Sequence, residues 1–408
     1  MTTEKQPIRL GVAIGLALAI FLIGAFLFRQ EGVNRSLADQ SRSLLFARAK
    51  SIKPEIVPPL ASFQRALFYQ PLNPRLLSGA LYVRSHAAKR AEVFAQGEGV
   101  LEGLGWRDTV AIQNRLFAAV QKRDVLQALD LADSLLRRDQ LTAEMTPLLN
   151  AMETMPEARA EIVRRLAKLP PWREAYLSNV SALKTAPLLE GRYRLLMALQ
   201  DDSTKLSVSE LAPSVNQIAN AGKIAEASQL WRRHVGKTKG SSILLDGNFA
   251  RFGESDFGER VGVPFEWYTS TGAGFSVTAI EGADSTDVEI RWDGRRSPLF
   301  LNQIVSARPG SYRLIVRVAE SPSTAQQMLE FSADCVKGGR NVFKFARTID
   351  RQRLEYVSDG PIACPDFRFS VRGDIAPRDL SSVRSRSVPV MPVSRVTSLS
   401  ELVLVPAR

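Results

Sequence analysis

Histidine and cysteine are scarce in this chain, with two of each among 408 residues. The histidines are His86 and His234, and the cysteines are Cys335 and Cys364. A protein zinc site takes three or four nitrogen or sulfur ligands at suitable spacing, and these four residues do not supply them. A histidine-centred catalytic triad is excluded from residues 243–408 because that stretch contains no histidine. We therefore predict that the protein is not an enzyme and holds no cofactor.

Negative charge is in deficit, because 54 lysines and arginines outnumber 42 aspartates and glutamates and give a net charge of +12. Nearly all of this excess lies in residues 1–243. A basic surface near a membrane attracts anionic lipid or an acidic glycan. An ordinary solvated helical surface is the favoured interpretation of this charge. Nucleic acid is not an expected partner, because no nucleic-acid motif and no interleaving of aromatic and basic residues accompanies the charge.

One long apolar run, Leu10–Phe28, lies between Arg9 and Arg29. A helix needs about 20 apolar residues to cross a bilayer core. A cleaved signal peptide is the alternative, but its apolar region is shorter and ends in small residues. This run ends in Phe26-Leu27-Phe28 instead. We predict a transmembrane helix over 10–28 after a cytoplasmic N-terminus, 1–9.

The orientation of this helix rests on opposing signals. Arg29, Arg35, Arg42 and Arg48 follow it, which under the positive-inside rule would keep the rest of the chain in the cytoplasm. That rule weakens for large translocated domains, a short N-terminus usually stays inside, and the cysteines favour export. We predict a single-pass protein of the bacterial inner membrane with its N-terminus inside and its bulk in the periplasm.

Residues 30–240 have the apolar spacing of helices, and two stretches share one design. Thr109–Lys122 and Val125–Arg138 form the first predicted helix pair, and Ser209–Ala221 and Ile224–Val235 form the second. Small residues on the second helix of each pair, Ala128 and Ala227, are separated by three periods of about 33 residues. Such spacing predicts stacked helical hairpins, and an irregular helical bundle is the alternative.

Two motifs carry a resemblance for this part of the chain. Pro71-Leu72-Asn73-Pro74 precedes a predicted helix, and Lys168-Leu169-Pro170-Pro171-Trp172-Arg173 has the composition of a repeat end. Residues 30–240 resemble degenerate tetratricopeptide repeats on these motifs, although the glycine and tyrosine usual on the first helix are mostly missing. The resemblance implies a protein-binding helical repeat domain. Trp172 and Trp231 are expected to be packing residues within it.

From Ile243 the pattern changes to short alternating runs rich in Val, Ile, Phe and Tyr, which follow a polar linker near residues 234–242. Nine short strands at this spacing predict an antiparallel β-sandwich over 243–408. They are Phe275–Ile280, Asp287–Trp292, Leu299–Val305, Ser311–Val318, Gln327–Ala333, Asn341–Ala346, Arg353–Val357, Asp366–Arg372 and Leu399–Val405.

The second half also carries a resemblance. Leu245–Phe249 with Pro264–Trp267 is similar to the opening of a jelly-roll carbohydrate-binding module, and Ser398–Val405 resembles its final strand, which returns beside the first. Arg308–Arg313 resembles the turn into a central strand. Ser381–Thr397 departs from the pattern and is expected to be a long connection with an edge strand at most, because Pro389 and Pro392 would break an interior one.

Cys335 and Cys364 lie in the predicted sandwich, where a pair confined to one external domain favours a disulfide, and two separate thiols are the alternative. Structural calcium is a further possibility, because jelly-roll modules often carry it. No calcium-loop motif matches, and a solvated strand end is the favoured interpretation of the densest acidic cluster. A glycosidase that uses two of these carboxylates is a remote alternative. The cluster consists of Glu281, Asp284, Asp287, Glu289 and Asp293.

Aromatic residues are the candidate glycan contacts, because sugar rings stack on exposed aromatic rings. Tyr268, Trp292 and Tyr312 are the candidates, although core packing is the favoured role for Trp292. Trp267 precedes Tyr268 on the same predicted strand and so faces the opposite way. Its place in the family pattern predicts that Trp267 is a core residue.

Taken together, the predicted fold class is a mixed α and β multidomain protein with a transmembrane helix, a helical repeat domain and a C-terminal jelly-roll sandwich. This combination resembles membrane-anchored envelope tetratricopeptide proteins of alphaproteobacteria. The resemblance implies a non-catalytic scaffold for exopolysaccharide or surface-glycan synthesis or export, with the inner membrane, envelope proteins and polysaccharide as partners. The main alternative is a glycan-binding receptor that acts through the sandwich.

Overall fold

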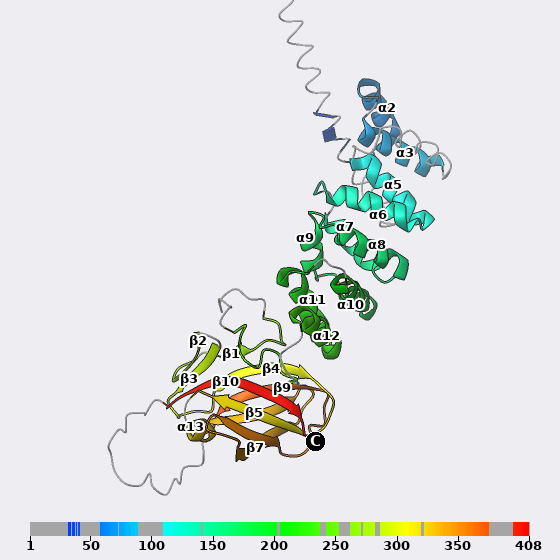
Figure 1. Ribbon diagram of the computed structural model, residues 1–408. Coiled ribbons are helices and arrows are strands. Elements are labelled where there is room, and N and C mark those ends of the chain that lie inside the picture. Colours follow the sequence, from blue (N-terminus) through cyan, green and yellow to red (C-terminus); the bar gives the residue numbers. More distant parts are fainter. Residues whose placement is uncertain are drawn as a thin grey trace, which may run out of the picture. The chain divides into compact units, whose positions relative to one another are not determined.

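The computed structural model describes two compact units, Met1–Met145 and Thr146–Arg408, which we treat separately (Figure 1). The described residues are 32–33, 35–36, 38, 40, 58–71, 73–88, 109–139, 142–201, 205–236, 242–252, 262–270, 272–281, 286–319, 322–374 and 395–407.

Helical hairpins make up the described part of the first unit. Helix α2 (Leu60–Tyr69) packs against α3 (Pro74–Ala88), and α5 (Thr109–Lys122) packs against α6 (Val125–Leu136). The turn between α5 and α6 is compact because Arg123 adopts a positive φ of 59° and the Asp124 side chain caps α6 by accepting the Gln127 N–H at 3.1 Å. Such a cap satisfies one of the backbone donors that a helix start leaves without a partner.

The small residue predicted on the second helix of this pair, Ala128, is buried, as expected for closely approaching helices. Ala132, one turn further along α6, is also buried, together with Leu116 and Ala119 of α5. The predicted limits of α5 are confirmed at both ends, and α6 ends two residues earlier than predicted. The hairpin design inferred from the sequence is therefore present at this point of the chain.

The second unit begins with six further helices in two rows. The end of α7 (Thr142–Met152), α9 (Arg173–Ser178) and α11 (Val208–Asn220) alternate along the chain with α8 (Pro156–Leu166), α10 (Ala186–Asp201) and α12 (Ile224–Val235). Helix α9 packs on α11, while α10 packs on both α8 and α12. The first helix of one hairpin therefore lies beside the first helix of the next, and the second helices do the same, which is the arrangement of a helical solenoid.

Buried ion pairs join successive hairpins in this stack. Arg192 of α10 reaches back to Glu153 with a 3.0 Å contact, and both side chains are fully buried. Arg173 of α9 donates to Glu210 of α11 at 2.7 and 3.0 Å. Close packing accompanies these bonds, because a Cβ on Gly191 would lie 3.1 Å from the Glu153 backbone. These partners fix the spacing of neighbouring hairpins.

In the described part of the chain, ten strands follow α12, and every pairing between them is antiparallel. Their spatial order is β1-β4-β9-β6-β7-β8-β5-β10-β3-β2. The helix α13 (Pro322–Met328) precedes β6. The strands are β1 (Tyr268–Thr269), β2 (Phe275–Glu281), β3 (Thr286–Trp292), β4 (Leu299–Ser306), β5 (Tyr312–Val318), β6 (Leu329–Cys335), β7 (Arg340–Thr348), β8 (Arg353–Ser358), β9 (Asp366–Gly373) and β10 (Arg395–Pro406).

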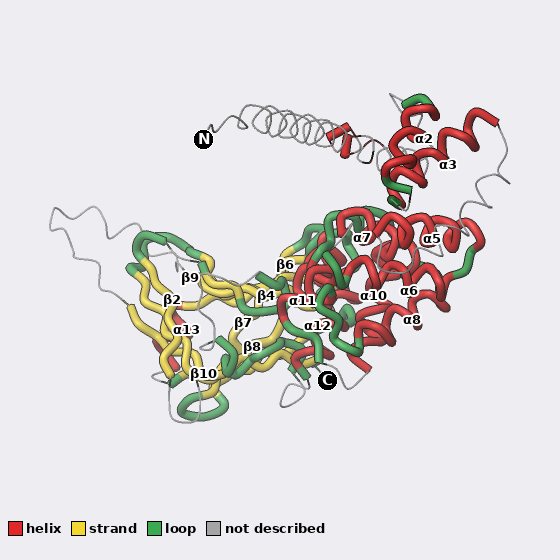
Figure 2. Tube along the Cα trace, turned by 90° about the horizontal axis from the view of Figure 1, so that it is seen from above, coloured by secondary structure: helices red, strands yellow, loops and turns green. Residues whose placement is uncertain are grey.

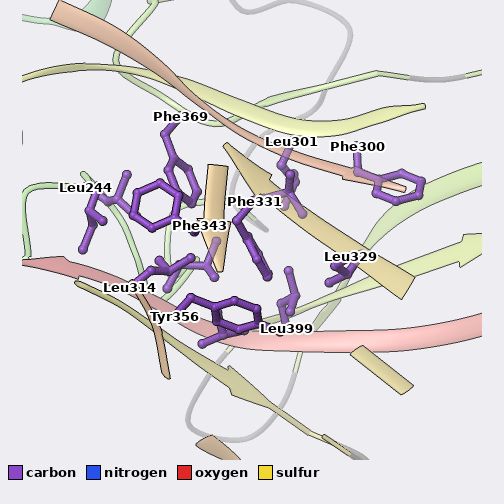
Figure 3. Close-up of a cluster of buried hydrophobic side chains, with 14 of the residues drawn as sticks. Leu244, Phe300, Leu301, Leu314, Leu329, Phe331, Phe343, Tyr356, Phe369 and Leu399 are labelled. Atoms are coloured by element: carbon purple, nitrogen blue, oxygen red, sulfur yellow. The ribbon is translucent and has the colours of Figure 1, made fainter. Parts of the chain in front are cut away.

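Strand β7 joins the two layers of this domain into one folded, barrel-like sheet. Its first residues, 340–342, pair with β6, and residues 343–348 pair with β8. The tube view in Figure 2 shows β4 and β9 in one layer and β8 and β10 in the other. Side chains from both layers meet in a core that contains Leu301, Phe331 and Phe369 (Figure 3). The burial of this apolar surface holds the layers together.

The opening and closing segments of the domain lie side by side, as the jelly-roll resemblance implied. The Ile243 N–H donates to the Leu404 carbonyl, and the Leu402 N–H donates to the Gly247 carbonyl. A Cβ on Gly247 would lie only 2.2 Å from the Leu402 carbonyl oxygen, so glycine is required there. Strand β10 lies between β5 and β3 rather than at an edge, whereas residues 381–394 of the predicted connection lie outside the described part of the chain.

The predicted membrane-anchored fold class and the inner-membrane localisation need correction. The predicted span, 10–28, lies outside the described residues. Within the part of the chain that the structure describes, no helix is long and apolar enough to cross a membrane. The longest of these helices, α10, has 16 residues, whereas a span takes about 20 apolar ones. The fold class that the structure supports is helical hairpins followed by one antiparallel, barrel-like sheet, and we withdraw the anchored, single-pass description.

Candidate functional site

The three predicted glycan-contact residues have different environments. Trp292 and Tyr312 are each only 2% exposed, whereas Tyr268 is 63% exposed. Trp292 packs edge-to-face on Phe300, and Tyr312 packs on Phe367, so both rings serve the core. The alternation of β3 and β5 explains this outcome, because every second side chain of each strand points into the sheet core.

Trp267 is buried, which confirms its predicted core role, and its neighbour Tyr268 points the other way. The Trp267 ring packs against Phe249 and Phe369, and its indole N–H donates to the Asp246 carbonyl at 2.9 Å. Trp172 and Trp231 in the helices are also buried, as predicted. Adjacent residues on one short strand therefore divide between core and surface, and the surface residue is Tyr268.

Tyr268 lies at a pocket of about 720 Å³ on the β1 edge of the sheet. The strand register explains which side chains accompany it. Tyr268 pairs directly with Asn302 of β4, and Ile304, two residues further along β4, pairs with Arg368 of β9. Directly paired residues and residues two apart project from the same face of a sheet. Asn302, Ile304 and Arg368 therefore extend from Tyr268 across the outer face of three strands.

The facing wall of the pocket is the segment that opens the domain. Gln303 holds this segment in place, because its side-chain amide donates to the Leu245 carbonyl at 2.9 Å and accepts the Leu245 N–H at 3.0 Å. The next residue, Asp246, accepts the backbone N–H of Arg251 through both carboxylate oxygens. Asp246, Arg251, Phe252 and residues 262–267 then complete this wall, and Trp231 of α12 contributes to the lining.

Charges in the pocket are partly paired. The Arg251 guanidinium contacts the Glu266 carboxylate at 2.9 Å and lies 6.0 Å from the centre of the Trp231 ring. Burial raises the pKa of Asp246 to about 6, although the N–H groups and the charge of Arg251 oppose that shift. Burial and the Arg251 charge lower the pKa of His234, whose ring packs on Trp231.

Arg368 is the exception to this pairing. Its side chain is exposed at the pocket and forms no ion pair with any carboxylate in the described part of the chain. Asp334 pairs with Arg368 across the backbone ladder, but its carboxylate contacts Arg340 instead, at 3.6 Å. A guanidinium without a partner beside an aromatic ring and an amide is a recognition group for an anion. The described lining of the pocket therefore combines an unpaired guanidinium with several neutral polar groups.

Comparison with known proteins does not identify the chain. No protein-family description and no curated protein matches it.

The cysteines form the predicted disulfide. Cys335 ends β6 and Cys364 precedes β9, and their sulfurs are bonded. Neither residue contributes to the pocket lining. The disulfide is therefore a structural cross-link of the sheet domain and not part of the pocket. Disulfides of this kind persist in an oxidising environment.

The acidic cluster considered for calcium is dispersed. Glu289 contacts Arg291 at 2.5 Å, and the Asp293 side chain accepts the backbone N–H of Arg295 at 3.0 Å. Glu281 and Asp287 lie on neighbouring strands, and Asp284 lies outside the described residues. Among the residues that the structure describes, no three histidine, cysteine or acidic side chains are grouped as metal ligands.

Sequence reasoning found Tyr268 but missed Asn302, Arg368 and the Arg251–Glu266 pair. Asn302 and Arg368 occupy outward positions in correctly predicted strands, so alternation alone marks them as surface residues. Their convergence depends on the pairing of β4 with both β1 and β9. That pairing is a long-range property, and it has no local signal in the sequence.

Proposed function

We propose that the protein is a non-catalytic scaffold whose helical hairpins bind partner proteins. The observation that carries the proposal is the set of bonds that join consecutive hairpins of the second unit. Besides the two buried ion pairs, Gln217 donates to the Leu183 carbonyl, and Tyr193 donates to Gln229, across separations of 34 and 36 residues. These separations match one helical-hairpin period. Bonds repeated at that interval support a continuous stack, which presents an extended surface without reactive groups.

One edge of this stack carries exposed apolar side chains. Leu169 connects α8 to α9 and is 65% exposed, and Val208 begins α11 and is 44% exposed. Arg173 links the two connections, because its guanidinium donates to the carbonyls of Leu166 and Lys205. Exposed apolar residues on a rigid edge favour protein contacts. We therefore assign partner binding to the edge formed by these two connections, which we call the Leu169–Val208 edge.

A role beside exopolysaccharide or surface-glycan machinery belongs to the same proposal. Its support is the resemblance of the hairpins to tetratricopeptide repeats and of the sheet to a jelly-roll module. A receptor that binds glycan between two aromatic rings has weaker support, because Trp292 and Tyr312 are buried in the core. A glycosidase is not supported by a pair of free carboxylates among the described residues that line the pocket, since Glu266 is bound to Arg251.

The test is chemical crosslinking in cells of the producing organism, followed by affinity purification of the full-length chain. We expect recovery of proteins of glycan synthesis or export. The double variant Leu169→Ser with Val208→Ser should lose most of this recovery while keeping its helical circular dichroism. Met155→Ser removes an exposed apolar side chain from the turn between α7 and α8 and is the matched control. Recovery of unrelated proteins alone, or equal recovery by the double variant, would contradict the proposal.

A further inference from the structure

We propose that the pocket beside Tyr268 binds a short saccharide that carries a carboxylate group. The proposal goes beyond the scaffold role and does not depend on it, because none of the residues that carry it belongs to the hairpins. The ligand is inferred from four features of the pocket: an exposed ring, an unpaired guanidinium, neutral hydrogen-bonding groups and an apolar floor. Each feature restricts the ligand in a different way.

The exposed ring of Tyr268 supplies a flat apolar face at the mouth of the pocket. Its strand is an edge strand of two residues, so no further strand covers it in the described part of the sheet. An aromatic ring gains most from a ligand that presents its own flat face of C–H groups, while the tyrosine hydroxyl stays in water. A saccharide ring has such a face, whereas a small inorganic anion does not.

Arg368 sets the charge of the ligand. A guanidinium with no carboxylate partner offers two parallel N–H donors to a planar carboxylate, and this bidentate geometry is stronger than a neutral hydrogen bond. The same face of the sheet connects Arg368 through Ile304 and Asn302 to Tyr268. A ligand that stacks on the ring and extends across β4 therefore places a substituent near Arg368. A carboxylate there completes a pair that the described residues leave open.

The remaining polar groups suit hydroxyls rather than further charges. Asn302 offers an amide donor and acceptor, and Thr269 offers a hydroxyl. Arg251 and Glu266 neutralise each other, so this end of the pocket adds hydrogen-bonding groups without net charge. A ligand with many hydroxyls and one carboxylate matches this distribution, whereas a ligand with several negative charges would meet Glu266 and Asp246.

The floor and the size of the pocket complete the match. Phe252, Phe265 and Trp267 line it and are buried, so the deepest surface is apolar and receives C–H groups. Its volume of about 720 Å³ falls in the range of 300–1,000 Å³ that is ordinary for ligand pockets. A saccharide of a few rings fits such a volume.

Titration calorimetry of the full-length chain tests the proposal with three probes: aldotriouronic acid (glucuronosyl-xylobiose), its methyl ester and inorganic phosphate. The acid has three sugar rings and a single carboxylate, and the ester keeps the rings and removes the charge. We expect saturable binding of the acid, with binding of the ester weaker by about tenfold or more. Arg368→Gln should weaken binding of the acid to the level of the ester and leave ester binding unchanged. Tyr268→Ala should weaken binding of both saccharides, and Tyr268→Phe should retain it.

Arg317→Gln is the matched control, because Arg317 is an exposed arginine of β5 that lies outside the pocket. It should bind aldotriouronic acid as the wild type does. Equal affinity for acid and ester, phosphate binding as tight as saccharide binding, absence of saturable binding, or an equal effect of Arg317→Gln would each overturn the proposal. A chain that binds no saccharide yet retains its crosslinked partners would overturn this proposal and leave the scaffold role standing.

Discussion

Among single residues, Arg192 shows how the helical stack handles a buried charge. Its guanidinium bonds to Glu153, to the Leu177 carbonyl at 3.0 Å and to the Asn150 side chain at 2.9 Å. It also lies over the Tyr176 ring at 4.8 Å, and the Tyr176 hydroxyl donates to Glu153. Burial opposes the charge of Arg192, but Glu153 and Tyr176 together outweigh burial and leave the pKa of Arg192 raised. The network therefore keeps a positive charge where water cannot reach.

Removing one partner of this network should be costly. Arg192→Met leaves the Glu153 carboxylate buried without its counter-charge, and we expect a loss of about 3–5 kcal/mol in unfolding free energy. Urea unfolding followed by circular dichroism at 222 nm measures the effect. Arg194→Met is the control, because Arg194 forms an exposed pair with Glu190 one helical turn away and should change stability by less than about 1 kcal/mol. Equal effects of the two substitutions would contradict a dominant role for burial.

The buried Asp246 carboxylate should make the unfolding free energy fall as pH rises, which is opposite to the effect of an ion-paired surface carboxylate. Its ordinary pKa is 3.8, and burial raises it to about 6 in the folded chain. Between these values the folded chain binds more protons than the unfolded chain, so stability falls as pH rises from about 4 to about 6. Asp246→Asn should remove that fall and gain about 1–3 kcal/mol at pH 7 but not at pH 4. Urea midpoints measured across this range, compared between the two proteins, test it; parallel profiles would refute the assignment.

Secondary-structure elements were predictable where the pattern is local. The limits of α5 and α12 match the apolar periodicity, and most strands begin and end within two residues of their predicted limits. Helix α13 was missed although Pro322 at its first position is a start signal. The sharing of β7 between two layers was not predictable, because it arises from pairing partners distant in the sequence. The prediction of the candidate site was incomplete for the same reason. Arg368 and Tyr268 share one face of the sheet only because β4 pairs with both of their strands.

The disulfide between the end of β6 and the segment before β9 should contribute to the unfolding free energy of the sheet domain. Cys335 and Cys364 are 29 positions apart, and closing a loop of that length contributes about 3–4 kcal/mol in the chain-entropy estimate. The double variant Cys335→Ser with Cys364→Ser should lose most of that free energy. Adding a reductant to the wild type should lower its unfolding midpoint to that of the variant and leave the variant unchanged. A reductant effect of equal size on both would show that the bridge is not the cause.

For the whole molecule, the division into two compact units predicts two separate unfolding transitions. Within the second unit, the Arg232 guanidinium donates to the Ile243 carbonyl and Arg251 lies near Trp231, so α12 is bonded to the sheet domain. We expect Arg192→Met and the double cysteine variant to shift the same calorimetric transition. Leu135→Ala, which opens a cavity at a fully buried residue of the first unit, should shift a different one by about 2–5 kcal/mol. One transition that responds to all three substitutions would contradict this division.

The central position of β10 has a consequence for synthesis on the ribosome. Strands β3 and β5 each pair with β10 along one edge, while β2 and β8 pair with their other edges, and the segment at Ile243 and Gly247 also bonds to β10. The nascent chain therefore carries these three segments with open backbone edges until residues 395–406 have left the exit tunnel. Open edges of apolar strands are prone to pair with other chains. Translation speed and chaperone contact over this interval should therefore decide how much of the protein reaches its native fold.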